Sequence, residues 1–181
     1  MKLFFLLLAV ALGLNLSAQD MFPDGTPIPE WFRQNRATDI KSLGKAYDIT
    51  EYGVLNDSTT LQTEKIQAII DKASKEGGGV IVIPAGTYLS GSLFFKPNTH
   101  LYLEKDGVLK GSDDIADFEI LKTRMEGQTL DYFAALINAD GVDGFTISGE
   151  GTINGNGLRY WTAFWLRRKI NPKSSILVHL G

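Results

Sequence analysis

"KEGGGVIVIPAGTYLSGSLFF", residues 75–95, places three consecutive glycines directly before a run of branched aliphatic residues. Glycine loops that bind phosphate lead from a strand into the N-terminus of a helix, and in nucleotide-binding loops Gly-Lys-Ser/Thr follows. Here a helical pattern precedes the glycines, an extended pattern follows them, and Gly-Lys-Ser/Thr does not follow. We therefore interpret the glycines as turn residues and not as a nucleotide site.

The residues before the glycines, 57–79, predict an amphipathic helix. Apolar residues recur at i, i+3, i+4 and i+7, which is one face of a helix; they are Ile66, Ile69, Ile70 and Ala73. Thr59 and Gln62 have the spacing of a capping box at the start of the helix. Gly77 is suited to the left-handed conformation that ends a helix.

After the glycines the pattern changes to short apolar runs separated by turn residues. The runs are Val80–Ile83, Leu93–Phe95, Leu101–Leu103, Val108–Leu109, Ala135–Ile137, Phe145–Ile147 and Thr152–Ile153. Ile81 and Leu101 are 20 residues apart, and Val82 and Leu103 are 21 apart, which is about one turn of a parallel β-helix. Residues 112–134 interrupt this rhythm as a loop. The sequence predicts an all-β fold, a right-handed parallel β-helix whose N-terminal end is capped by the preceding helix.

The N-terminal region predicts export and an extended arm. Residues 1–18 have the charged start, apolar core and small final residues of a signal peptide, so a periplasmic or extracellular location is expected. Residues 19–50 are rich in proline, which breaks helices and sheet ladders, and we expect Trp31 and Phe32 to anchor this arm. Residues 51–181 are expected to form the N-terminal rungs of the coil.

Composition excludes several classes of site and partner. The chain has no cysteine and two histidines, His100 and His179, so disulfides, thiolate metal sites and histidine metal sites are not expected. No cofactor is expected. Without residues 1–18 the chain keeps 17 basic and 21 acidic side chains, a net charge of −4. This balance gives no reason to expect nucleic acid or an anionic membrane as partner, although a local basic cleft would suffice for a polyanionic substrate.

Several segments carry a family resemblance. "YDITEYGV" at 47–54, "HLYLEKDGVLKGS" at 100–112, "TRMEG" at 123–127 and "ALINADGVDGFTISGEGTINGNGLRYW" at 135–161 resemble the N-terminal part of glycoside hydrolase family 28, the polygalacturonase group with its rhamnogalacturonan-directed relatives. The resemblance implies a secreted enzyme that hydrolyses O-glycosidic bonds in pectic polysaccharide with inversion, using clustered aspartates and no metal.

The signature elements of that family are absent from this chain. They are Asn-Thr-Asp, Asp-Asp, Gly-His-Gly and Arg-Ile-Lys, and the resemblance places them on later rungs. We interpret Asp113-Asp114 as a solvated turn and "RRKI" at 167–170 as a solvated surface. No catalytic residue and no metal ligand is assigned, and the substrate-binding residues stay unknown. The chain is expected to be a truncated and inactive portion of such an enzyme. The alternatives are a non-catalytic carbohydrate-binding β-helix and a polysaccharide lyase of the same fold, which would need acidic calcium-binding clusters.

Three further groups have a structural and a functional interpretation. Arg124 and Glu126 could contact a carboxylate-bearing sugar, but we favour an ion pair that orders their loop. Aromatic residues near the C-terminus could form a sugar platform, but we favour packing of a short helical or looped segment onto the coil; they are Tyr160, Trp161, Phe164 and Trp165. Asn138, Asn154 and Asn156 are expected to be turn residues, hydrogen-bonded along neighbouring rungs.

Overall fold

The computed structural model describes residues 21–33, 38–125 and 127–170, so the expected signal peptide lies outside the described residues. The chain divides after Arg36 into two compact units. In the first, the 3-10 helix η1 (Glu30–Arg33) carries Trp31 and Phe32, whose rings stack with centroids 3.8 Å apart. The expected role of Trp31 and Phe32 as anchors of the arm stays a prediction.

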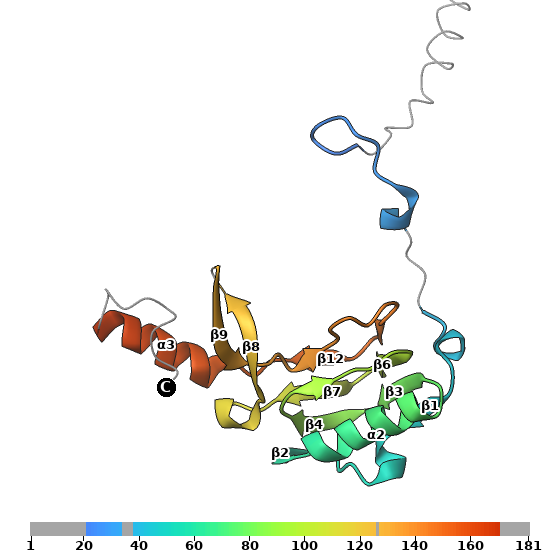
Figure 1. Ribbon diagram of the computed structural model, residues 1–181. Coiled ribbons are helices and arrows are strands. Elements are labelled where there is room, and N and C mark those ends of the chain that lie inside the picture. The colour runs from blue at the N-terminus through green and yellow to red at the C-terminus, as the bar shows by residue number, and fades with distance from the viewer. Residues whose placement is uncertain (1–20, 34–37, 126, 171–181) are drawn as a thin grey trace, which may run out of the picture. The chain divides into compact units, whose positions relative to one another are not determined.

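The second unit is built from three parallel sheets (Figure 1). The first sheet has the order β1 (Ala46–Asp48), β3 (Gly79–Ile83), β6 (Thr99–Leu103) and β11 (Ile147–Gly149). The second has the order β2 (Asp57–Leu61), β4 (Gly86–Ser90), β7 (Gly107–Gly111) and β12 (Thr152–Asn154). The third pairs β5 (Leu93–Phe94) with β10 (Ile137–Asn138). Successive turns of the chain add one strand to each of the first two sheets, and the two middle turns also add one to the third, which confirms the predicted parallel β-helix.

The strand register confirms one of the two predicted spacings. Ile81 lies opposite Leu101, the pair expected from the 20-residue interval. Val82 lies opposite Tyr102 and Leu103 lies opposite Ile83, so the 21-residue interval does not join paired residues of this sheet. The longer interval belongs to the second sheet, where Gly86 lies opposite Gly107. It arises because the turn between β6 and β7 contains one residue more than the turn between β3 and β4.

The helix α2 (Thr63–Lys75) caps the N-terminal end of the coil, as predicted. Its four predicted core residues are buried and belong to the same apolar cluster as the interior residues of the rungs. Among the described residues, no strand pairs with the edge of β5 that faces this end. Instead, the Gln67 amide accepts a hydrogen bond from Phe94 N at 2.8 Å and donates one to Phe94 O at 3.0 Å. The helix therefore satisfies backbone groups that a further strand would otherwise pair.

The start of α2 differs from the prediction, whereas its end agrees. Residues Asp57–Leu61 form β2, and the Thr59 hydroxyl bonds the Asp57 carboxylate at 2.6 Å, so the proposed capping box is wrong. Gln62 occupies the N-cap position without a capping side-chain hydrogen bond. Gly77, with φ of 101°, has the positive φ expected where the helix ends.

The coil begins before the expected boundary at residue 51. β1 already pairs with β3, and the 3-10 helices η2 (Ile40–Leu43) and η3 (Ile49–Tyr52) flank it. Gly79 has φ of 149°, and a Cβ there would lie 2.4 Å from Lys45 O. The third glycine of the opening stretch therefore allows the chain before β1 to approach β3 closely.

The interruption at 112–134 leaves the coil between β7 and β10. It contains a short 3-10 helix, η4 (Ile115–Asp117), and an antiparallel hairpin of β8 (Ile120–Met125) and β9 (Gln128–Phe133). The prediction of an excursion is confirmed, but its main part is a hairpin and not a loop. After the last rung the chain forms α3 (Leu158–Ile170), which lies beside this hairpin (Figure 1).

Apolar side chains stack in register through the interior of the coil. Tyr47, Ile81 and Leu101 are opposite one another in successive strands and have no exposure. The next member of this column, Ile147, is 46% exposed. In the second sheet Leu109 is fully buried, whereas its partner Ile153 is 42% exposed. The apolar interior therefore reaches the surface at the last rung, which we call the open end (β10, β11 and β12).

Candidate functional site

The acidic pair Asp113-Asp114 forms a turn, as predicted. The Asp114 carboxylate accepts a hydrogen bond from Ala116 N at 3.0 Å and begins η4. Both carboxylates approach the Arg159 guanidinium of α3, at 3.8 Å from Asp113 and 3.6 Å from Asp114. The two acids thus link the excursion to α3, and this exposed ion pair was not evident from the sequence.

Two of the three asparagines connect neighbouring rungs. Asn138 Nδ2 donates to Leu93 O at 3.1 Å, and Asn156 Nδ2 donates to Gly111 O at 3.0 Å. The third, Asn154, accepts a hydrogen bond from Asn156 N within its own turn. The expected hydrogen bonds between rungs are confirmed for Asn138 and Asn156, but Asn138 and Asn154 end the strands β10 and β12 and are not turn residues.

The remaining polar candidates do not gather at one place. Arg124 is exposed on β8, opposite Thr129 of β9, and Glu126 lies outside the described residues, so their ion pair stays a prediction. His100 lies on β6, where burial lowers its pKa, and its buried Nδ1 has no hydrogen-bond partner in the part of the chain that the structure describes. His179 is also outside the described residues. The "RRKI" segment forms the exposed last turn of α3.

An aromatic cluster joins α3 to the hairpin. The Tyr160 ring lies edge-on to Phe133 with centroids 5.4 Å apart, and its hydroxyl is 2.7 Å from the Tyr132 hydroxyl. Burial, together with this hydrogen bond, raises the pKa of Tyr132. Phe164 stacks on Tyr160 one turn later, with centroids 6.4 Å apart. The hairpin and α3 therefore share a small apolar contact outside the coil.

The other two aromatic residues of α3 face solvent. Trp161 is 52% exposed and Trp165 is 57% exposed, and α3 has no fully buried residue. Tyr160 thus packs against the hairpin, with Phe164 stacked on it, and not onto the coil as expected, whereas the expected packing is wrong for Trp161 and Trp165. The Arg168 guanidinium lies over the Trp165 ring, 5.7 Å from its centroid, which places a cation beside an exposed indole.

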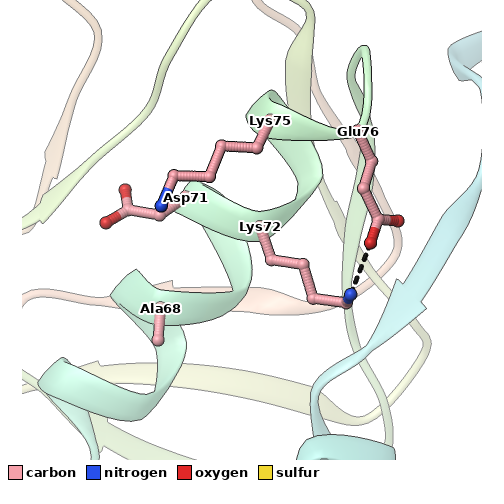
Figure 2. Close-up of a pocket in the computed structure, with 5 residues that line it drawn as sticks. All are labelled: Ala68, Asp71, Lys72, Lys75 and Glu76. Atoms are coloured by element: carbon pink, nitrogen blue, oxygen red, sulfur yellow. Dashed lines mark hydrogen bonds and ion pairs between the residues drawn. The ribbon is translucent and has the colours of Figure 1, made fainter.

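A hollow of about 440 Å³ lies on the outer surface of α2 (Figure 2). Its lining is Ala68, Asp71, Lys72, Lys75 and Glu76. Glu76 accepts hydrogen bonds from Lys45 and Tyr47, each at 2.8 Å, and also from Lys72. These bonds lower the pKa of Glu76 to about 2. The charged side chains at this hollow therefore pair with one another, and the bond from Tyr47 to Glu76 joins β1 to the end of α2.

The carboxyl groups with shifted pKa are shifted in the direction opposite to that of a general acid. Hydrogen bonds from Thr59 and Thr60 lower the pKa of Asp57 to about 2. Burial raises the pKa of Asp71, but hydrogen bonds from Lys96 and Gln67 outweigh it and lower the value overall. A glycosidase acid must hold a proton near neutral pH, which requires a raised pKa. These groups are therefore structural anions.

Within the described ranges 21–33, 38–125 and 127–170, no group of three or more His, Asp or Glu side chains could hold a metal ion. None of the helices in these ranges has the length and apolar character needed to cross a membrane.

Short parallel strands stacked in three sheets under a capping helix define the class, a parallel β-helix. The family described as "Rhamnogalacturonase A/epimerase, pectate lyase-like" matches residues 46–162. The chain belongs to this family, and the predicted resemblance to glycoside hydrolase family 28 is confirmed.

Individual relatives are similar over most of this chain but only part of their own length. A "Probable polygalacturonase" of Vitis vinifera is 30% identical over 69% of this chain and 27% of its own length. An "Exo-poly-alpha-D-galacturonosidase" of Dickeya chrysanthemi is 32% identical over 79% of this chain and 24% of its own. The crystal structure of an exopolygalacturonase from Thermotoga maritima superposes with a TM-score of 0.58 and 27% identity, over 70% of this chain and 28% of that one. This chain therefore spans about a quarter of these relatives.

Proposed function

We propose that this chain is the N-terminal portion of an exported glycoside hydrolase that cleaves O-glycosidic bonds in pectic polysaccharide, and that this portion alone is inactive. Family membership and the polygalacturonase relatives support the class of reaction and substrate. In this proposal residues 1–18 direct export, residues from 19 to the start of the coil form an arm, and the coil provides the first rungs of the enzyme.

The open end is the observation that carries the proposal. Ile147 and Ile153 continue two interior columns whose preceding members are fully buried. Each fully buried side chain of this kind stabilises a fold by about 1.5–3 kcal/mol, so further rungs stacked on β11 and β12 would gain the burial that these two residues lack. We infer that such rungs supply the catalytic aspartates.

The carboxyl groups of this chain also support an assignment of the catalytic aspartates to further rungs. Inversion requires one carboxyl group that protonates the leaving oxygen and a second that activates water, at a separation of about 6.5–9.5 Å. Asp113 and Asp114 both pair with Arg159, and hydrogen bonds lower the pKa of Asp71 in α2, Asp57 in β2 and Glu76 at the end of α2. This chain would contribute the capped end that keeps the catalytic rungs in register.

The test compares this chain with a longer product of the same gene on de-esterified polygalacturonate. We expect no new reducing ends from residues 19–181, and reducing ends with inverted anomeric configuration, measured by NMR, from the longer protein. Hydrolysis by residues 19–181 alone would contradict the proposed inactivity. Unsaturated products from the longer protein would replace the hydrolase with a lyase.

A further inference from the structure

We propose that one face of α3 binds an acidic polysaccharide chain of the polygalacturonate type. This inference rests on the proposed function for the choice of polysaccharide, and it adds a contact surface outside the coil. We call this surface the outer face of α3; it consists of Leu158, Trp161, Trp165, Arg168 and Lys169.

The contact with the hairpin determines which way this face points. Tyr160 and Phe164 lie on the side of α3 that meets β9, through the ring and hydroxyl contacts of Tyr160. A helix turns by about 100° per residue, so Trp161 and Trp165, at i and i+4, share a different face. Both indoles are more than half exposed. Tyr160 therefore anchors α3 to the hairpin, with Phe164 stacked on it, whereas Trp161 and Trp165 are presented to solvent.

Exposed indoles beside cations have the chemistry that recognises an acidic sugar. An indole ring offers a flat apolar surface for the C–H face of a pyranose ring, while arginine pairs with a carboxylate through directed hydrogen bonds. Arg168 lies against Trp165, and Lys169 is exposed in the next position. A uronic-acid chain carries both an apolar ring face and a carboxylate on every residue, so it can satisfy both kinds of group.

The local charge favours an anionic partner. Helix α3 carries Arg159, Arg167, Arg168 and Lys169 but no acidic residue, whereas the whole chain has a net charge of −3. Arg159 approaches Asp113 and Asp114, so the cations assigned to the outer face are Arg168 and Lys169. A basic surface on an acidic protein directs an anionic ligand to that surface.

Two other occupants are less consistent with the structure. A membrane-surface helix needs its apolar residues gathered on one side, but Leu166 and Ile170 are exposed on a side of α3 different from that of Trp161 and Trp165. Further rungs of the coil would stack on β11 and β12, whereas α3 lies beside the hairpin, to one side of the stacked sheets (Figure 1). The outer face is therefore separate from the open end.

The experiment measures binding of the full chain to de-esterified polygalacturonate oligomers by titration calorimetry, with no bond cleavage required. We expect the double variant Trp161→Ala/Trp165→Ala to bind about tenfold more weakly than the parent. The variant Arg168→Gln/Lys169→Gln should also bind more weakly, and its affinity should depend less on salt because two charged contacts are lost. The matched controls are Trp31→Ala, which removes an indole that is 64% exposed in the other unit, and Lys105→Gln, which removes an exposed lysine from the turn before β7.

Three outcomes would overturn the inference. They are a parent chain that does not bind, control variants that weaken binding as much as the α3 variants, and tighter binding to vesicles of anionic phospholipid than to polygalacturonate. If the chain binds alginate as tightly as polygalacturonate, the outer face binds acidic polysaccharides in general and does not prefer galacturonate. The reducing-end assay on the longer protein is independent of all these readouts, so failure of the outer face is distinguishable from failure of the proposed hydrolase.

Discussion

The side-chain amide of Gln67 takes the place of a neighbouring strand at the free edge of β5. Its carbonyl and amino groups pair with the N–H and C=O of Phe94. Alanine at this position would leave both backbone groups without these partners in a half-buried location, and an unsatisfied buried group costs about 1–3 kcal/mol. We expect Gln67→Ala to lower the free energy of unfolding by about 2 kcal/mol, measured by urea denaturation.

A matched substitution on the same helix separates this effect from helix propensity. Lys75→Ala changes an exposed residue of α2 and should alter stability only slightly. Alanine favours helix at least as well as glutamine or lysine, so a loss confined to Gln67→Ala must come from the missing hydrogen bonds. Equal stability of the two variants would show that the amide pair does not hold the cap in place.

At the scale of elements, the hairpin and α3 depend on each other. An isolated two-stranded hairpin is only marginally stable in water, and β9 contacts α3 through Tyr132 and Phe133. We expect Tyr160→Ala to speed amide hydrogen exchange in β8 and β9 by about tenfold or more, a loss of roughly 1.4 kcal/mol or more. Amides of β3 and β6 should be unaffected, because these strands lie inside the coil.

The neighbouring residue provides the control for this coupling. Trp161→Ala removes an aromatic side chain of similar size from the same turn of α3, but from its exposed side. It should leave exchange in the hairpin unchanged. If both substitutions accelerate exchange equally, the hairpin responds to the stability of α3 as a helix and not to the contact made by Tyr160.

The same elements show how far the sequence determines the fold. The 20-residue interval between Ile81 and Leu101 was visible because the intervening turns are tight and marked by glycine and proline, which set the length of a rung. β1 and β2 were missed because α2 lies between them and the later strands, so their distance along the sequence from β3 and β4 is longer than the 20-residue interval of the later rungs. The hairpin was predicted as a loop because its strands are mostly exposed on both faces, so no apolar alternation marks them.

The candidate site was less predictable than the coil. The pattern of aromatic residues in α3 left a helical and a looped segment both open and did not show which rings face the hairpin, since that depends on the position of Phe133, 27 residues before Tyr160. The role of Gln67 likewise depends on the unpaired edge of β5, which no local pattern reveals. Long-range placement decides both, and sequence periodicity reports only which face of an element is apolar.

At the scale of the whole molecule, the open end determines how the chain behaves alone. Unpaired strand edges and an exposed apolar interior are templates for association with another chain. We expect residues 19–181 to self-associate and to be poorly soluble, with a sedimentation coefficient that increases with concentration. Ile147→Lys/Ile153→Lys places two charges at the ends of the interior columns and should shift the protein towards monomer.

The control for this variant is Ile120→Lys, at a residue of the hairpin that is 60% exposed. It adds charge away from the open end and should have a smaller effect. A parent chain that is monodisperse and unfolds cooperatively would contradict this prediction, and equal effects of the variants would assign the association to net charge and not to the open end.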